Sequence, residues 1–251
     1  MSRHPYLDHD GPIAFAHRGG AHDFPENTIR AFQAAVELGY QYIETDVHAT
    51  SDGKLVAFHD FSLDRVTDRT GKIRHTTWAD VSAARIGGAE PIPRFEELLE
   101  ALPNTRINID VKHVSAIAPL VAAIKAAKCI ERICIGSFSG RRLDAMRNIF
   151  GDSLCTSLGP IEVARLLAQS RGVGTLKTQA LCAQVPVRQG PIAVADARFI
   201  DQAHRLDLPV HGWTIDDPAE MNRLLDLGVD GIMTDRLTAL KDVMIARGAW
   251  R

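Results

Sequence analysis

The chain has 251 residues, of which 45% are hydrophobic and 24% are charged, a composition typical of globular proteins rather than disordered or fibrous ones. The formal net charge is −2 and long lysine or arginine runs are absent, which excludes the charge pattern of proteins that bind nucleic acid or anionic membrane surfaces. Because there is no N-terminal signal pattern and no run approaching about 18 apolar residues, we expect a cytoplasmic protein without stable membrane association.

Eight β-like runs alternate along the chain with amphipathic, helix-like segments. The runs are residues 13–17, 42–47, 106–112, 133–138, 154–158, 180–185, 209–215 and 231–235. In the first helix-like segment, Asn27 is placed to cap the helix and Gly39 to end it. Repetition of strand and helix favours a parallel sheet, and eight repeats favour its closure. We therefore predict an α/β fold with a single (β/α)8 TIM barrel, one domain over residues 1–251.

Residues 48–93 interrupt this alternation after the second strand. Asp52 and Gly53 form a strong hairpin signal, so the second strand is expected to run past the barrel rim and fold back. A two-residue turn there would pair Asp46 with His59 and place Glu44 on the same face. The residues from about 61 to 93 predict a small excursion over the barrel mouth.

The sequence contains four cysteines in apolar surroundings, and none of them belongs to a C-x-x-C pair. They are Cys129, Cys134, Cys155 and Cys182. This spacing argues against a zinc site or a disulfide framework and predicts buried thiols.

In barrels of this kind, chemistry takes place at the C-terminal ends of the strands. Ionisable residues are crowded at the ends of the first three strands and on the returning hairpin, whereas the fourth, fifth and sixth strands end mostly in small or apolar residues. The ionisable set is His17, Arg18, Glu44, Asp46, His59, Asp110 and Lys112, and Trp213 follows on the seventh strand. Each feature alone is common at solvated strand ends, and a tryptophan is more often core filling. Their convergence on adjacent strands favours a functional site.

Three carboxylates in this set, Glu44, Asp46 and Asp110, suit a hard divalent cation bound through oxygen, Mg²⁺ or Ca²⁺. Without a cation they would repel one another in a partly dry barrel mouth. Arg18 and Lys112 add positive charge, and the fork of Arg18 matches phosphate oxygens. The grouping predicts a phosphate-ester site.

His17 and His59 complete this site. Imidazole has a reference pKa of about 6.5, so it can take a proton from a nucleophile or give one to a leaving alkoxide near neutrality. We therefore predict acid–base roles for both side chains.

The motifs HRGG, PENT, ETDVHATSDGKLVAFHD, WTIDDP and GVDGIMTDR together resemble the glycerophosphodiester phosphodiesterase family over nearly the whole chain. The resemblance implies a barrel of the phosphatidylinositol-phospholipase-C type, a divalent metal and two catalytic histidines, which map onto His17 and His59. It maps the metal ligands onto Glu44, Asp46 and Asp110. It also places Arg18 and Lys112 near the phosphate, and Glu26 and Asn27 as supports. We assign Trp213 to substrate binding.

One site residue departs from the family pattern. The family most often has glutamate where Asp110 stands, so this ligand is one methylene shorter and leaves room for a bridging water in place of direct contact.

The predicted function is metal-dependent hydrolysis of a small-molecule glycerophosphodiester to sn-glycerol 3-phosphate and an alcohol, with the acid role assigned to His59. The resemblance suggests that the 2-hydroxyl of the substrate attacks phosphorus first, because an oriented neighbouring hydroxyl has a high effective concentration. Water then opens the cyclic phosphate.

Other functions stay open at this point. Lysophospholipase D activity would need an apolar site for an acyl chain, but the excursion has only dispersed apolar residues: Phe61, Leu63, Val66, Ile73 and Trp78. A metallo-amidohydrolase would want H-x-H on the first strand, which is absent. A non-catalytic binding barrel is disfavoured because both histidines and all three carboxylates are present.

Overall fold

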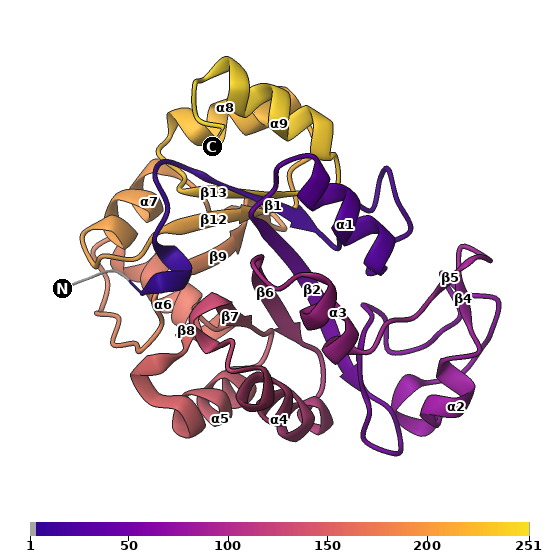
Figure 1. The fold of residues 1–251 in the computed structure, drawn as a ribbon. Helices are drawn as coiled ribbons and strands as arrows, with labels where there is room; N and C mark the ends of the chain where they lie inside the picture. The colour runs from indigo at the N-terminus through magenta and orange to yellow at the C-terminus, as the bar shows by residue number, and fades with distance from the viewer. Residues whose placement is uncertain (1–3, 251) are drawn as a thin grey trace.

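The computed structural model describes residues 4–250, which form a barrel of parallel strands surrounded by helices (Figure 1). The strands hydrogen-bond in the order β8-β7-β6-β2-β1-β13-β12-β9, and β3 pairs antiparallel with β2. Their bounds are β1 (Ile13–His17), β2 (Tyr42–Ala49), β3 (Leu55–Ala57), β6 (Arg106–Val111), β7 (Ile133–Gly136), β8 (Cys155–Thr156), β9 (Ala183–Pro186), β12 (Val210–Trp213) and β13 (Gly231–Thr234).

The two ends of this sheet, β8 and β9, meet through a parallel bridge between Ser157 and Cys182. The N–H of Leu158 donates to the carbonyl of Cys182, and the N–H of Leu181 donates to the carbonyl of Thr156, both over 2.9 Å. These contacts close the ring, so the predicted TIM-barrel fold is confirmed, with a strand within each of the eight predicted runs or overlapping it.

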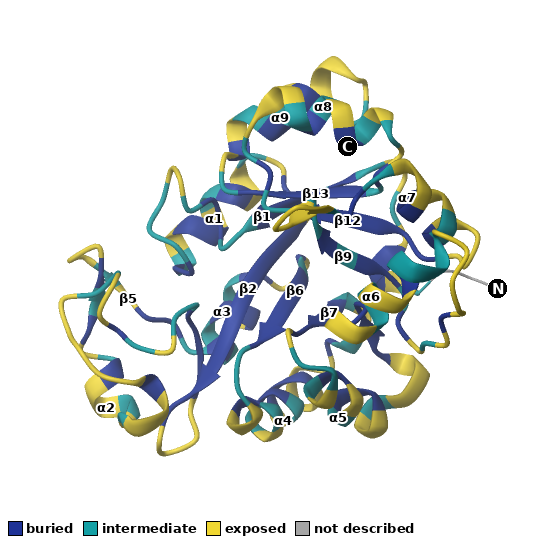
Figure 2. Cartoon of the chain, turned by 180° about the vertical axis from the view of Figure 1, so that it is seen from behind, coloured by how far each residue is buried: buried dark blue, intermediate teal, exposed yellow. Residues whose placement is uncertain are grey.

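Helices cover the outside of the ring, with buried faces toward the strands and exposed faces outward (Figure 2). They are α1 (Ile29–Glu37), α3 (Phe95–Ala101), α4 (Ile117–Ala127), α5 (Gly140–Phe150), α6 (Pro160–Gln169), α7 (Ala197–His204), α8 (Pro218–Asp226) and α9 (Leu237–Ala246). Single 3₁₀ turns lie at η1 (Pro5–Leu7), η3 (Val114–Ala116), η4 (Ile130–Arg132) and η5 (Gly151–Ser153), and a short hairpin pairs β10 (Arg188–Gln189) with β11 (Ile192–Ala193).

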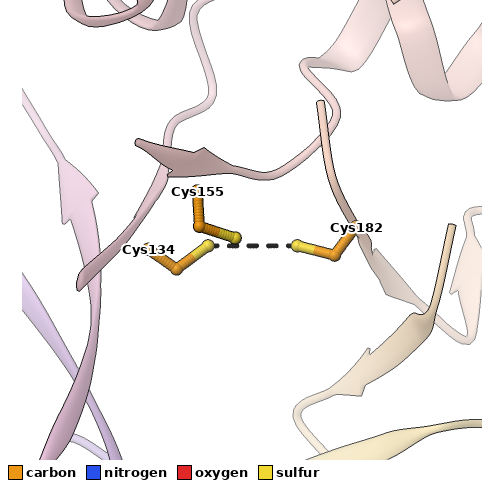
Figure 3. Close-up of side chains that lie close together, drawn as sticks. All are labelled: Cys134, Cys155 and Cys182. Atoms are coloured by element: carbon orange, nitrogen blue, oxygen red, sulfur yellow. Dashed lines mark hydrogen bonds between the residues drawn. The ribbon is translucent and has the colours of Figure 1, made fainter. Parts of the chain in front are cut away.

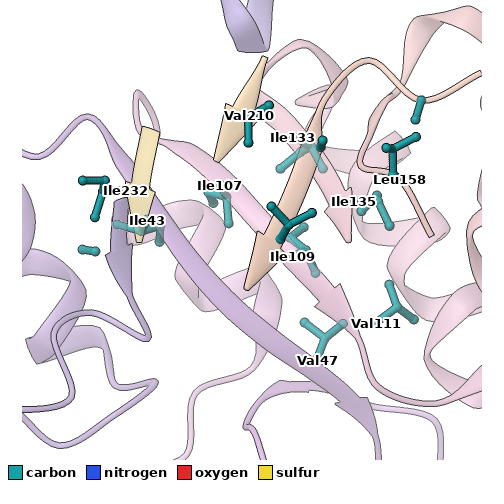
Figure 4. Packing of buried hydrophobic residues seen from close by; sticks show 14 of the residues in the cluster. Ile43, Val47, Ile107, Ile109, Val111, Ile133, Ile135, Leu158, Val210 and Ile232 are labelled. Carbon is teal, nitrogen blue, oxygen red and sulfur yellow. The ribbon is translucent and has the colours of Figure 1, made fainter. Parts of the chain in front are cut away.

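The main core lies between these helices and the outward faces of the strands (Figure 4). In β6, Ile107, Ile109 and Val111 are buried in this core, and the alternate residues Asn108 and Asp110 line the cavity inside the barrel. The period of two in RINIDV therefore serves both faces of the strand. The same alternation carries charged side chains into the barrel without disturbing the core.

The α1 helix is capped by Thr28, whose side-chain oxygen accepts the N–H of Ala31 over 3.1 Å. The prediction that Asn27 caps this helix is wrong. Asn27 has a left-handed backbone, φ +57°, which asparagine tolerates better than most residues, and its side chain turns toward β2. Gly39, at φ +99°, ends the helix as predicted.

The hairpin after β2 has a three-residue loop, so the predicted two-residue turn is wrong. Thr50 faces Lys54, and the side-chain oxygen of Thr50 accepts the N–H of Lys54 over 2.9 Å. Gly53 takes φ +79°, as in a type I turn followed by a bulge. This shifts the register by one, so the N–H of Phe58, rather than His59, meets the carbonyl of Asp46.

Residues 61–93 form a small lobe that stands beside the barrel, next to the end of β2 (Figure 1). The lobe contains η2 (Ile73–His75), α2 (Trp78–Val81) and the paired β4 (Arg85–Ile86) and β5 (Glu90–Pro91). Leu63, Ile73 and Ile86 pack with the hairpin residues Val56 and Phe58 in a separate core. Most of the apolar side chains of the lobe are therefore used for its own folding.

The 3₁₀ turn η1 lies at the N-terminal ends of the strands, where it packs against the first residues of β1 and β2. Tyr6 is fully buried there, and its carbonyl accepts the hydroxyl of Tyr42, the first residue of β2, over 2.8 Å.

No helix of residues 4–250 is both long and apolar enough to cross a membrane.

Candidate active site

A cavity of about 590 Å³ opens at the C-terminal ends of the strands. Eight of the ten predicted site residues line it: His17, Arg18, Glu44, Asp46, His59, Asp110, Lys112 and Trp213. The other two stand behind them. Asn27 donates its amide to Asp46 over 3.2 Å, and Glu26 accepts from Arg18 over 3.4 Å. The structure therefore brings the whole predicted set together. We call the seven ionisable residues that line the cavity the polar wall.

The turn after β1 explains why HRGG follows this strand. Arg18 has φ +50°, and both following glycines have positive φ. A Cβ on Gly19 would lie 2.7 Å from the Cβ of Ala31, and a Cβ on Gly20 would lie 2.6 Å from Leu237. The close packing requires glycine at both positions. It holds His17 and Arg18 at the rim of the cavity.

Asp46 and Asp110 lie side by side, because β2 and β6 pair these two residues in register. The ammonium of Lys112 bridges them, 2.8 Å from Asp46 and 2.7 Å from Asp110. Arg18 Nε lies 3.4 Å from Asp46. Burial opposes ionisation of Asp46, but Lys112 and Arg18 together lower its pKa. Asp46 is therefore a paired carboxylate.

Glu44 has much weaker compensation. The backbone N–H of Arg18 donates to it over 3.3 Å, and His17 Nε2 lies 3.7 Å away. Burial, with the neighbouring charge of Asp46, raises the pKa of Glu44 to about 7. A buried carboxylate in this state is stabilised in its charged form by a nearby cation.

Asp110 also has unused capacity. Its Oδ1 is buried without a hydrogen-bond partner in the described part of the chain, and burial raises its pKa in spite of Lys112. The all-oxygen donor set and this orphaned atom suit Mg²⁺ or Ca²⁺. However, no choice of one carboxylate oxygen from each of Glu44, Asp46 and Asp110 brings all three oxygens within 4.8 Å of one another.

His17 is oriented by a carboxylate from the opposite end of the sequence. Its Nδ1 lies 2.7 Å from Asp235 Oδ1, just beyond β13. Donation of the Nδ1 proton to Asp235 leaves Nε2 for the cavity side. Burial lowers the pKa of His17, but Glu44 and Asp235 outweigh it, so the pKa is raised. Sequence reasoning assigned no role to Asp235. It is the last residue of the predicted strand run 231–235, and this position at a strand end was the signal that could have found it.

His59 has an equivalent partner in the adjacent residue. Its Nδ1 lies 2.6 Å from Asp60, which also pairs with Arg65 over 2.6 Å. Arg65 and His59 lower the pKa of Asp60 to about 2. Arg65 makes two further bonds to Glu26, of 2.9 and 2.7 Å. Asp60 and Arg65 were missed, although an acidic residue directly after a candidate histidine was a usable signal.

The opposite side of the cavity is apolar. We call this the apolar wall: Phe138, Leu158, Val163, Leu167, Ile192 and Trp213. The rings of Phe138 and Trp213 meet edge to face at 5.6 Å. Phe138 is 65% exposed at the mouth of the cavity. These side chains come from the segments after β7 and β8, from α6, from β11 and from β12, so the cavity has two chemically different sides.

The chain is similar along most of its length to known proteins. A family model described as the glycerophosphoryl diester phosphodiesterase family matches residues 17–239. A Mycobacterium tuberculosis protein named probable glycerophosphodiester phosphodiesterase 2 is 40% identical over 251 residues, covering 98% of this chain and 95% of that protein. The human protein lysophospholipase D GDPD1 is 28% identical over 267 residues, covering 91% of this chain and 85% of that protein.

The fold is also that of a solved structure. A phosphodiesterase from Oleispira antarctica, solved in complex with the product sn-glycerol-3-phosphate, matches with a TM-score of 0.77 and 21% identity, covering 94% of this chain and 97% of that chain. The resemblance seen in the motifs is thereby confirmed: the chain belongs to the glycerophosphoryl diester phosphodiesterase family and is a phosphoric diester hydrolase.

Proposed function

We propose that this protein hydrolyses glycerophosphodiesters to sn-glycerol 3-phosphate and an alcohol, in a reaction that needs a divalent metal. The observation that carries the proposal is the pair of histidine–carboxylate contacts, His17 with Asp235 and His59 with Asp60, on one cavity that also contains Arg18 and Lys112. Two oriented imidazoles and two cations suit proton transfer around a phosphate diester.

Arg18 and Lys112 are the residues that would bind the phosphoryl oxygens, Arg18 through its planar fork and Lys112 as a point charge. Glu44 and Asp46 would hold Mg²⁺ or Ca²⁺, with Asp110 as a third ligand directly or through a water. When bound, the metal supplies positive charge to the phosphoryl oxygens. The weak compensation of Glu44 and the orphaned oxygen of Asp110 support this assignment.

The two histidines would divide the proton transfers. His17 takes the proton of the attacking 2-hydroxyl of the glycerol, and His59 gives a proton to the leaving alcohol oxygen. Both have Nδ1 on a carboxylate, which leaves Nε2 for the reacting group. Water then opens the cyclic phosphate. Comparable turnover of a 2-deoxy glycerophosphodiester would rule out this route and favour direct attack by water.

Lysophospholipids are a second candidate substrate class. The apolar wall is the specific observation that favours them, because it offers an acyl chain a surface beside the polar wall. The lobe of residues 61–93 is not needed for this purpose.

The test is an assay of metal-stripped protein on a panel of glycerophosphodiesters and lysophospholipids, with detection of glycerol 3-phosphate for the former and lysophosphatidic acid for the latter. We expect no turnover in excess chelator and recovery with Mg²⁺ or Ca²⁺. Full turnover by stripped protein in chelator would overturn the metal requirement. If no substrate yields glycerol 3-phosphate or lysophosphatidic acid with metal present, the proposed function is overturned.

A further inference from the structure

A second cluster of chemistry-bearing side chains lies on the barrel axis, one layer below the cavity. It consists of Cys134, Cys155, Cys182 and His211, and all four are fully buried. Each stands two residues before a residue that lines the cavity: Gly136, Ser157, Gln184 and Trp213. Because side chains alternate along a strand, the four point toward the barrel axis beneath those residues. We call this set the thiol layer.

The three sulfur atoms converge (Figure 3). All lie within 4.8 Å of one another, and the sulfurs of Cys134 and Cys182 are 3.9 Å apart. A disulfide would require about 2.05 Å, so the thiols are free. In a tetrahedral zinc site with Zn–S bonds of about 2.3 Å, neighbouring sulfurs are roughly 3.8 Å apart. The observed spacing is therefore close to that of a zinc site.

A nitrogen donor lies near the sulfurs but outside the group of three whose atoms are all within 4.8 Å of one another. It is His211, which β12 places opposite Gln184 of β9 and whose ring interacts with the thiol of Cys182. The ring of His211 has no hydrogen-bond partner within residues 4–250 apart from the thiol of Cys182, and the hydroxyl of Tyr6 has none there. Buried imidazoles and phenols ordinarily have partners. A phenol without a partner and an imidazole whose partner is a thiol, both beside three convergent thiols, point to a ligand.

Simple packing accounts for only part of this arrangement. Cysteine is a common small core residue, and Cys129 behaves as one, with its sulfur 3.9 Å from the carbonyl of Ile124. Packing gives no reason for a buried imidazole beside these thiols whose partner is the thiol of Cys182. The sequence argument against zinc relied on the absence of C-x-x-C spacing. Here the spacing is set by adjacent strands, each of which supplies one ligand.

We propose that Cys134, Cys155 and Cys182 bind a zinc ion on the barrel axis, with His211 becoming the fourth ligand after a turn of its side chain. Binding displaces the three thiol protons and leaves a net charge of −1, toward which the hydroxyl of Tyr6 can donate. A closed set of four protein ligands makes the site structural rather than catalytic. It is separate in place and chemistry from the carboxylates above it, and it does not depend on the proposed function.

The test uses the full chain, unfolded under reducing conditions with chelator and refolded with equimolar Zn²⁺ or Co²⁺. We expect about one zinc ion per chain, resistant to dilute EDTA, by elemental analysis. We expect the cobalt form to show sulfur-to-cobalt charge-transfer absorption in the near ultraviolet and the visible bands of a tetrahedral ion. Both readouts are independent of catalysis.

Variants locate the ion. Cys134→Ser and Cys182→Ser should lose most of the zinc and the charge-transfer band, and His211→Ala should weaken retention and alter the visible bands. Cys129→Ser is the matched control, also a buried cysteine, and should keep both signals. Circular dichroism reports whether each variant folds.

The proposal is overturned if the refolded wild-type chain takes up neither zinc nor cobalt, a result that needs no variant. It is also overturned if folded Cys134→Ser and Cys182→Ser retain the ion as well as Cys129→Ser does. In that case the thiols are packing residues, and water would be the partner of His211 and Tyr6.

Discussion

The polar wall and the apolar wall of the cavity differ in how their side chains are held. On the polar wall, Lys112 contacts two carboxylates within 2.8 Å, and His17 and His59 each contact a carboxylate within 2.7 Å. On the apolar wall, Phe138 is mostly exposed and has one ring contact and one cation contact, with Trp213 and Lys112.

This difference separates reaction from substrate range. Charged side chains in mutual contact hold a fixed geometry, which a phosphoryl group must match. An apolar surface without directional bonds accepts groups of different shape. We infer that the polar wall determines the reaction and the apolar wall determines which alcohol group is accepted.

The largest expected effect concerns the histidines. His17→Ala and His59→Ala should each lower turnover by roughly 10² to 10⁴, the usual range for loss of a general acid or base, on every substrate tested. Initial rates at saturating metal give the measurement. His22→Ala is the control, because His22 is exposed and contacts only Asp23 among the ion pairs of the described chain. Loss of activity on only one substrate class would break the separation of the two walls.

A good leaving group sharpens this result. When p-nitrophenol is the leaving group of the phosphodiester, its oxygen needs little protonation. This substrate should therefore partly restore turnover in His59→Ala and not in His17→Ala. Equal rescue of both variants would remove the assignment of His59 as the acid.

The next effect concerns Asp60. Asp60→Asn keeps the shape of the side chain but weakens a charge-assisted bond to His59, so we expect turnover to fall roughly 10- to 100-fold. Asp64→Asn is the matched control, since Asp64 lies four residues further on, in the lobe, and accepts the N–H of Gly71. If both variants behave alike, Asp60 does not position His59.

A smaller effect is expected on the apolar wall. Val163→Asp places a charge in the cavity, so we expect roughly tenfold lower kcat/KM for a lysophospholipid and little change for glycerophosphoethanolamine. Ile161→Asp is the matched control on the same helix, because Ile161 is 67% exposed. Equal loss on both substrates would mean that the two walls do not act separately.

The smallest effect concerns pH. His48 is buried near the C-terminal end of β2, where its Nε2 donates to the carbonyl of His59 over 3.1 Å, and burial lowers its pKa to about 4. Between pH 6.5 and 4 the unfolded chain binds a proton that the folded chain rejects. Stability from His48 is therefore complete above pH 6.5 and decreases toward pH 4, by up to about 3 kcal/mol.

His48→Gln retains an amide donor and removes this titration. The melting temperature of this variant should change less between pH 6.5 and 4 than that of the wild-type chain. Parallel profiles for the two proteins would contradict the role of His48.

The polar wall is predictable from the sequence because its residues lie at strand ends, and strand ends are visible as limits of apolar runs. His17, Glu44 and Asp110 need only the barrel topology to come together. Their partners are less visible. Asp235 is distant in sequence, and Arg65 acts through the fold of the lobe, which has no periodic pattern.

Local competition explains the wrong predictions. Thr28 and Asn27 are both suitable caps, and the hydrogen bonds of the Asn27 side chain with Asp46 and Thr45 decide between them. In the hairpin, the side chain of Thr50 binds Lys54 and adds one residue to the loop. Such choices depend on side-chain contacts that spacing alone does not encode.

The apolar wall and the thiol layer are hidden for a different reason. Val163 and Leu167 have the pattern of ordinary helix core residues, and only the tertiary structure turns them toward the cavity. Cys134 and Cys182 are 48 residues apart in the sequence and become neighbours through strand order. No short motif reports either arrangement.

The strands β8 and β9 are the two ends of the sheet, and fewer paired positions join them than join the other neighbouring strands. β2 and β6 share six paired positions, whereas this junction has a single isolated bridge. Local opening is easiest where few bonds must break together. Deuterium should therefore enter the barrel first at the amides of Leu158 and Leu181. In denaturant we expect β8 and β9 to separate first and β2 and β6 to separate last.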